Sequence, residues 1–288
     1  MFRALFLSLT LLLPAVAKAQ TLSFDGVAAV GATDFHGGSG LAFVDMTLAL
    51  PLSSHAPLRL EIGTLLYGLD GKRPHETYGA VAWNGAWRMG AVRPAYDTVL
   101  ISAFTRAAPF LAYERAEYSR AHATVEAMRR TAVPWGLSWT GGYDRTRLAV
   151  SAHDAVKGGF RSASASGSYL GNGWDLAAAV EAVWSRDGTH DGVNTKIGGG
   201  VTIGTSHVGL AWLRPEVNDR RDALSLDITV QMSRRLDLLG FGEVTKTGKD
   251  DAYGIALDYR MKPDTDMISA VSQNARGSIV HLTLERRF

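Results

Sequence analysis

The chain lacks cysteine, has few prolines and contains no long apolar run after its first 20 residues. None of the 288 residues is cysteine, so disulfide bonds do not stabilise this protein. Only 9 residues are proline, against 31 glycines. No stretch beyond residue 20 approaches the roughly 18 apolar residues of a membrane-spanning helix. Hydropathy alone would class the chain as soluble, but strands with alternating apolar residues give a much weaker signal.

Residues 1–19 have the features of a secretory signal peptide. Arg3 lies in a short basic start, residues 4–13 are mainly apolar, and Ala17-Lys18-Ala19 matches an A-x-A cleavage site. The apolar run is too short to cross about 30 Å of hydrocarbon as a helix. We therefore expect export with cleavage, which leaves residues 20–288. Cleavage removes two basic residues and leaves 28 of each sign, so charge gives no support to a nucleic-acid partner.

Apolar and polar residues alternate with a period of two across residues 20–288, which is typical of strands with one apolar face. Residues 224–232 are one example, and short turn signals such as Asn84-Gly85 predict antiparallel neighbours. The sequence predicts about sixteen strands, and because the segments near residues 80, 166 and 198 have mixed faces, the total could be fourteen. Their centres lie near residues 26, 45, 62, 80, 90, 135, 149, 166, 179, 198, 210, 228, 241, 257, 269 and 283. No second domain or linker is visible.

One strand indicates what its apolar face contacts. Trp174 and Trp184 lie at the two ends of an apolar face that spans ten residues, roughly 33 Å. At a tilt of about 45° this gives roughly 23 Å of height, close to the apolar band of membrane barrels with aromatic girdles. The alternative is a β-sandwich whose core strand carries a tryptophan at each end. Aromatic residues near the ends of other strands favour the membrane barrel: Trp135, Trp139, Trp212, Tyr253 and Phe288.

The chain ends in an alternating strand, residues 278–288, whose last residue is Phe288. Terminal segments fray unless neighbouring structure holds them. A closed barrel provides this, because its last strand pairs with both its predecessor and the first strand. The candidate first strand lies directly after the predicted signal peptide and has Leu22, Phe24, Ala28 and Val30 in register. We therefore predict an all-β, antiparallel up-and-down transmembrane barrel.

Residues 94–125 form the one connection that breaks this pattern. They do not alternate, and loops longer than about 12 to 15 residues usually have a function. Val99, Phe104 and Phe110 make the segment too apolar to extend into water. Because it follows the fifth predicted strand, we expect it on the side of the barrel away from the C-terminus.

This layout resembles the general porins of Gram-negative outer membranes. The strand "GAWRMGAVRPAYD" is similar to the G-x-x-x-x-G-R strand entry of that superfamily, although Ala91-Val92-Arg93 stands where Gly-Arg is usual. The resemblance implies that residues 94–125 fold into the barrel lumen and present acids opposite arginines of the wall. The pore-constriction residues implied in this way are Arg59, Arg88, Arg93, Asp97, Glu114 and Glu117.

Opposed charges in a narrow aqueous slot create a transverse field. Polar solutes align with this field, whereas apolar solutes must displace ordered water and are disfavoured. The alternative interpretation is that these charges lie on a wet face and only pair with their neighbours.

No catalytic, metal or cofactor site is predicted. The 8 histidines include no pair at metal-ligand spacing. Residues 240–250 look like a phosphate-binding loop, but Asp250 stands where Ser or Thr is required. No G-x-S-x-G motif is present, and His153 near Ser151 is the nearest candidate for a barrel hydrolase.

We therefore predict an outer-membrane porin that passes small hydrophilic solutes and ions passively and is not an enzyme. The resemblance implies a homotrimer in the outer membrane of a Gram-negative bacterium. Two alternatives stay open: an outer-membrane barrel enzyme of the phospholipase or protease type, and a soluble exported β-sandwich binding protein.

Overall fold

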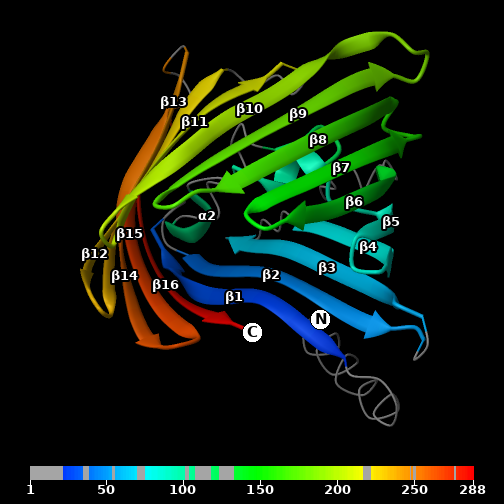
Figure 1. Cartoon of the computed structure of the whole chain (residues 1–288). Coiled ribbons are helices and arrows are strands. Elements are labelled where there is room, and N and C mark those ends of the chain that lie inside the picture. The colour runs from blue at the N-terminus through cyan, green and yellow to red at the C-terminus, as the bar shows by residue number, and fades with distance from the viewer. Residues whose placement is uncertain are drawn as a thin grey trace.

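Sixteen strands form one closed antiparallel barrel (Figure 1). This computed structural model describes residues 22–34, 39–53, 56–69, 75–100, 104–107, 118–122, 133–216, 222–246, 248, 251–275 and 277–288. The predicted all-β barrel of about sixteen strands is confirmed, and the alternative of a β-sandwich is wrong because the sheet closes on itself. The predicted signal peptide lies outside the described residues and stays a prediction.

The strands follow one another around the barrel in chain order. They are β1 (Ser23–Thr33), β2 (Ser39–Pro51), β3 (Leu58–Leu69), β4 (His75–Trp83), β5 (Trp87–Ala91), β6 (Trp135–Tyr143), β7 (Thr146–Ala155), β8 (Phe160–Leu170), β9 (Trp174–Ser185), β10 (His190–Ile203), β11 (Ser206–Pro215), β12 (Ala223–Ser233), β13 (Leu236–Thr245), β14 (Ala252–Lys262), β15 (Thr265–Asn274) and β16 (Gly277–Arg287). Each predicted strand centre falls inside one of these strands. Between β5 and β6 lie a 3₁₀ helix, η2 (Ala95–Thr98), and a short α-helix, α2 (Phe104–Ala107).

The last strand closes the barrel by pairing with the first. The register of β1 and β16 runs from Val27 opposite Arg287 to Thr33 opposite His281. The backbone N–H of Phe288 donates to the carbonyl of Gly26 at 3.0 Å, so pairing continues to the last residue. This explains why the chain ends in a well-formed strand: both of its edges are occupied.

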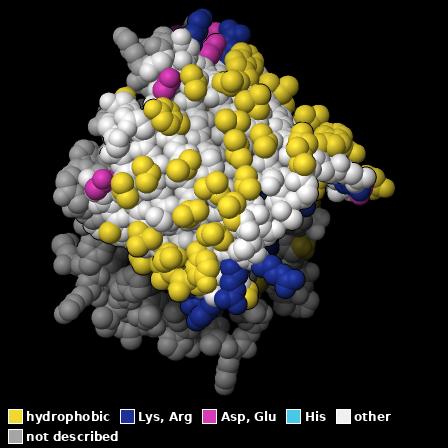
Figure 2. Space-filling view, turned by 90° about the vertical axis from the view of Figure 1, so that its left-hand side faces the viewer, with side chains coloured by type: hydrophobic (Ala, Val, Ile, Leu, Met, Phe, Trp, Pro, Cys, Tyr) yellow, Lys and Arg dark blue, Asp and Glu magenta, His cyan; other side chains and the backbone are white. Residues whose placement is uncertain are grey.

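The apolar side chains of the strands point away from the lumen. On β9 the outward set includes Trp174, Leu176 and Val180, which are exposed, whereas Ala179 and Glu181 on the opposite parity are buried. Figure 2 shows apolar side chains spread over one outer face of the barrel, with Lys and Arg at its lower edge and also at its upper edge. Successive side chains of a strand point to opposite faces, so the alternation in the sequence is converted directly into an apolar exterior.

Short turns join the strands at the edge of the barrel where β1 begins and β16 ends. The tightest of them match the residues that such turns require: in the turn between β4 and β5, Asn84 and Gly85 have φ values of 52° and 68°. Two consecutive positive φ angles are the condition for a type I′ turn, which suits the twist of antiparallel strands. Among the described residues, no helix is long and apolar enough to cross a membrane.

One part of the inner wall is apolar, contrary to the expectation of a wet inner face throughout. Buried residues of β1, β2 and β13 to β16 form a cluster with α2, and Phe104 of α2 packs edge-on against Phe241 with ring centroids 5.1 Å apart. In Figure 1, α2 lies inside the ring of strands. Because α2 covers this patch, water is removed from it and the apolar inner side chains are stabilised there.

Candidate functional site

Two predicted arginines meet on one carboxylate of the inner wall. Arg59 is the second residue of β3, and Arg88 is the second residue of β5. Both therefore lie near the edge of the barrel where β1 begins and β16 ends. The Nε atoms of Arg59 and Arg88 lie 2.8 and 2.7 Å from the two carboxylate oxygens of Glu61 on β3. Arg88 also donates to Thr140 Oγ1 at 3.1 Å. Glu61 is only 7% exposed, so most of its surface is covered by these partners and by the wall.

The third predicted arginine lies where the chain leaves β5. The guanidinium of Arg93 donates to Asp45 on β2 at 2.7 Å and lies 4.4 Å from the ring centroid of Tyr78 on β4. The ring of Tyr78 occupies the space above Gly63, where a Cβ would lie 1.8 Å from the ring. Gly63 therefore permits Tyr78 to lie flat against β3 and to support Arg93 by a cation–π contact.

These groups surround a cavity of about 530 Å³ on the inner side of β1 to β6. Arg59, Arg88 and Arg93 line it together with Glu61, and Ala95 and Thr98 of η2 form its boundary toward the long connection. A second cavity of about 330 Å³ lies along β6 to β8 and has Thr98, Thr140 and Ala149 in common with the first. The two cavities therefore lie next to each other on the inner side of β1 to β8.

The start of the long connection is bonded to polar side chains of the inner wall. The N–H groups of Ala95 and Tyr96 donate to Ser151 on β7 at 2.8 Å and to Ser164 on β8 at 3.2 Å. Thr98 and Ser166, also on β8, share a hydroxyl hydrogen bond of 2.7 Å. These small hydroxyl side chains satisfy backbone donors that would otherwise be buried without a partner.

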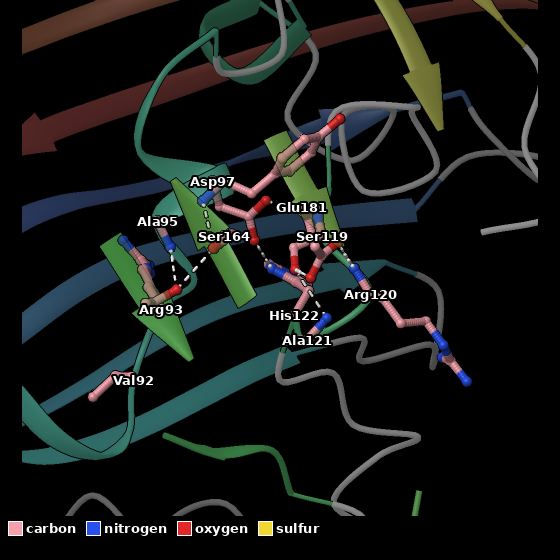
Figure 3. A network of polar contacts seen from close by, with 12 residues as sticks. Val92, Arg93, Ala95, Asp97, Ser119, Arg120, Ala121, His122, Ser164 and Glu181 are labelled. Atoms are coloured by element: carbon pink, nitrogen blue, oxygen red, sulfur yellow. Dashed lines mark hydrogen bonds and ion pairs between the residues drawn. The ribbon is translucent and has the colours of Figure 1, made fainter. Parts of the chain in front are cut away.

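A second polar network joins two arms of the long connection, residues 95–98 and 118–122, to each other and to β9. Asp97 accepts a hydrogen bond from the Ser119 N–H at 2.8 Å and lies 3.2 Å from His122 Nδ1. Glu181, fully buried on β9, accepts from Ser119 Oγ at 2.5 Å and from the Arg120 N–H at 2.8 Å. Asn194 on β10 donates to it at 2.8 Å. Figure 3 shows the side chains of Asp97, Ser119, His122 and Glu181 gathered together, whereas the Arg120 side chain points away from them.

The structure brings together some of the residues predicted at the constriction and separates others. Arg59, Arg88 and Arg93 lie around one cavity, as their inward parity indicates. The Asp97 side chain is 7% exposed and belongs to the network at the base of the connection, so it does not face the cavity as an open charge. Glu114 and Glu117 lie outside the described residues.

Sequence reasoning missed Glu61 and Glu181, although the parity of both could have indicated them. Glu61 lies two residues from Arg59 on the same face of β3, and Glu181 is an acid within the inward face of β9. Their partners are on other strands or on the connection, so only the tertiary structure shows which charges meet.

The candidate hydrolase pair does not form in the structure. Ser151 Oγ is engaged by Ser164 and Ala95, and His153 Nε2 donates to the Val92 carbonyl at 3.2 Å. Both side chains are buried beneath the connection rather than at the rim. In the described part of the chain, no group of three His, Asp or Glu side chains is arranged to hold a metal ion.

Known proteins share this architecture. No protein-family model and no curated protein matches the chain. A mutant of the Rh. blastica porin superposes with a TM-score of 0.74 at 15% sequence identity, over 93% of this chain and 100% of that one. This chain has the fold of a bacterial porin. A triple mutant of the Rhodopseudomonas blastica porin matches with a TM-score of 0.72 at 14% identity and the same coverage.

The porin fold explains the layout of the site but does not assign its residues. At 14% to 15% identity the likeness concerns the path of the backbone. The roles of the arginines and of the buried acids must therefore be derived from the contacts of this chain.

Proposed function

We propose that this protein is an outer-membrane porin, a water-filled channel through which small hydrophilic solutes and ions diffuse passively. The observation that supports this most directly is the charged cavity inside a closed sixteen-strand barrel with an apolar exterior. Barrels of this strand number are wide enough to keep an aqueous channel. Transport of this kind makes and breaks no covalent bond, so the proposal requires no catalytic group.

The outward apolar face supports a position within a lipid bilayer. Exposed aliphatic side chains cover the outer surface, and exposed aromatic residues such as Trp135, Trp174 and Phe288 lie near strand ends. Such a surface is stable in lipid and unfavourable in water. Together with the predicted signal peptide at residues 1–19, this favours export to the outer membrane of a Gram-negative bacterium. Assembly as a homotrimer is part of the proposal and derives from the resemblance to general porins.

Selectivity would arise at the arginine-lined cavity. Arg59 and Arg88 share the single carboxylate of Glu61, so these three side chains together carry one positive charge, and Asp25 adds one negative charge to the lining of the same cavity. Arg93 and its partner Asp45 add a second, neutral pair further along the wall. Charged groups fixed on a narrow aqueous passage orient polar solutes and exclude apolar ones. We propose Arg59, Arg88 and Arg93 as constriction residues, and we assign Asp97 to the support of the connection.

Planar-bilayer recording tests the proposal. The mature protein, refolded in detergent and added to one side of a lipid bilayer, is expected to produce discrete current steps that scale linearly with voltage. Protein that is folded by heat-dependent gel mobility but produces no steps at any concentration would contradict the channel function. Incubation of the same sample with labelled lipid and labelled peptide tests the enzyme alternative, for which no turnover is expected.

A further inference from the structure

Basic side chains are concentrated on one arc of the barrel edge where β1 begins and β16 ends. Four of them lie in turns or at strand ends of this arc and are exposed: Arg234, Arg235, Lys262 and Arg286. We call these four residues the basic strip. Elsewhere on the same edge, three turns contain no charged residue: 84–86, 171–173 and 204–205. The positive charge is therefore local and is not a general property of this rim.

Only one carboxylate in the described turns of this arc offsets the charge of the strip. Arg286 Nε lies 3.4 Å from Asp264 in the β14–β15 turn, and Lys262 interacts electrostatically with the same carboxylate. No carboxylate of the described residues forms an ion pair with Arg234 or Arg235. Four basic groups against one acid leave three positive charges on the strip.

The inner side of the same arc has no such excess. Arg260 lies 3.9 Å from Asp237, and Arg287 pairs with both the buried Asp266 and Glu285. These two arginines have the inward parity of their strands, and the acids around them outnumber them. The surplus of positive charge is therefore confined to the rim and does not extend into the lumen.

Backbone hydrogen bonds hold the turns of the strip side by side. The Arg260 N–H donates to the Arg235 carbonyl at 2.8 Å, which joins the β12–β13 turn to β14. The Arg287 N–H donates to the Asp264 carbonyl at 2.9 Å, which joins the β14–β15 turn to β16. The strip thus extends over the ends of β12 to β16, about 19 Å at roughly 4.8 Å for each strand spacing. Its backbone positions are fixed by the sheet.

The strip borders directly on the apolar outer face. The outward side chains next to it are exposed and apolar: Met232, Tyr259 and Met261. On β12 the outward apolar set from Leu224 to Met232 spans roughly 26 Å along the strand, or about 20 Å of height at a tilt of about 40°. This is close to the apolar band of a membrane barrel, so the strip lies at the depth of the lipid headgroups. Figure 2 shows Lys and Arg directly below an apolar surface at the lower edge of the barrel.

We propose that the basic strip is a docking site for an anionic glycerophospholipid, whose phosphate contacts the strip while its acyl chains lie along Met232, Tyr259 and Met261. Guanidinium groups donate paired hydrogen bonds to phosphate oxygens. A headgroup with a net negative charge is favoured over a zwitterionic one, because the latter presents its own ammonium group to three positive charges. Methionine side chains adapt to acyl chains through their flexible thioether groups.

A lipid fits this surface better than an acidic protein does, because the charge lies at the border of an apolar face that a bilayer covers. The proposal goes beyond the channel function. It rests on the proposed position of the barrel in a membrane and is independent of ion conduction.

Native mass spectrometry of the refolded protein in neutral detergent measures this binding. Phosphatidylglycerol and phosphatidylcholine with identical acyl chains are titrated separately, and folding is verified by heat-dependent gel mobility. The test variant removes three charges from the strip: Arg234→Gln, Arg235→Gln and Lys262→Gln together. The matched control removes three exposed charges at the opposite edge of the barrel: Lys157→Gln, Arg161→Gln and Arg186→Gln together.

The unsubstituted protein is expected to bind phosphatidylglycerol at least about tenfold more tightly than phosphatidylcholine, and the test variant to lose about tenfold in that affinity. The control variant should retain the affinity of the unsubstituted protein. Equal affinity for the two lipids, an unchanged test variant or an equal loss in the control would overturn the proposal. If the test variant does not fold, Arg234→Gln alone should give a smaller loss in the same direction.

The same samples distinguish other occupants of the strip. Binding of a polyglutamate peptide without binding of phosphatidylglycerol would identify a protein-docking surface and overturn the proposal. A changed oligomeric state of the test variant with unchanged lipid binding would assign the strip to a contact between copies, which also overturns it. Unsubstituted protein that binds phosphatidylglycerol but conducts no current would instead contradict the channel function, so the two failures are distinguishable.

Discussion

Replacing Glu181 by Gln is expected to release the base of the connection while leaving the barrel intact. Three donors converge on the Glu181 carboxylate: the Ser119 hydroxyl, the Arg120 N–H and the Asn194 side-chain amide. A glutamine keeps one acceptor oxygen and places an NH₂ group where the second oxygen was. With the NH₂ group toward Arg120 and Asn194, two donors face another donor in a buried site. With the NH₂ group toward Ser119, the hydroxyl can turn to accept from it, but its own proton then loses the carboxylate as acceptor.

The magnitude follows from the number of bonds lost. A hydrogen bond to a charged group contributes about 1.5–3 kcal/mol, and a buried donor without an acceptor costs about 1–3 kcal/mol. Loss of one bond with partial rearrangement therefore weakens the attachment of residues 118–122 to β9 by about 2–4 kcal/mol. This corresponds to an increase of roughly 30- to 1000-fold in the population of molecules in which that arm is detached. The pairing of β9 with β8 and β10 is unaffected because it uses backbone groups.

Limited proteolysis with trypsin measures this population, because the connection contains Arg106, Arg115 and Arg120. When opening is fast relative to cleavage, the cleavage rate follows the open population. Glu181→Gln should therefore be cut within residues 94–125 at least about tenfold faster than the unsubstituted protein. Its single-channel current should also fluctuate more.

Asp175→Asn is the matched control, since it removes one carboxylate from the inner face of the same strand without contacting the connection's base. If Glu181→Gln does not fold, Ser119→Ala removes only the hydroxyl donor and should give a smaller increase in the same direction. Cleavage of a folded Glu181→Gln variant at the rate of the unsubstituted protein would refute the anchoring role.

Four further outcomes are expected. Arg88→Glu should shift the reversal potential in a salt gradient toward cation preference. Arg161→Glu, on the outer face, should leave the reversal potential unchanged. Equal shifts for the two variants would show that Arg88 does not line the passage. Gly63→Ala forces the neighbouring Tyr78 ring to move and should cost about 1–3 kcal/mol of stability in urea unfolding, with a changed conductance. Phe104→Ala should detach α2 and raise current noise, and unchanged noise would count against the docked helix. Hydrogen bonds from Ser185 and Thr189 lower the pKa of Asp187 in the β9–β10 turn. Its carboxyl NMR resonance should therefore titrate at a pH below the usual range for aspartate. The contacts of the turn should be lost only as the pH falls through that lowered pKa.

The alternation of apolar and polar residues was sufficient to predict the barrel. Each strand could be identified locally because its two faces meet different environments, as Ile62 and Glu61 on β3 illustrate. The same parity placed Arg59 and Arg88 on the inner wall. The mixed segments near residues 80, 166 and 198 caused the uncertainty between fourteen and sixteen strands, because small residues on both faces, such as Ser164 and Ala165, weaken the contrast.

The contents of the lumen could not be read from the sequence in the same way. Asp97 looked like a charge facing the pore, yet its carboxylate bonds to residues more than twenty positions away at the other arm of the connection. The apolar inner patch was hidden because Phe43 and Phe241 follow the polar parity of their strands and pack in a cluster that includes Phe104 of α2.

The sequence by itself therefore determined the strands and their faces, because a period of two is a property of neighbouring residues in one segment. It indicated the closure of the barrel as well, because an alternating strand at the very end of the chain needs a partner on each edge. Only the tertiary structure decided which charges share a carboxylate and where the long connection is attached. Those contacts join residues as distant as Ala107 and His281, which are 174 positions apart, and no local pattern encodes a contact between segments so far apart in the chain.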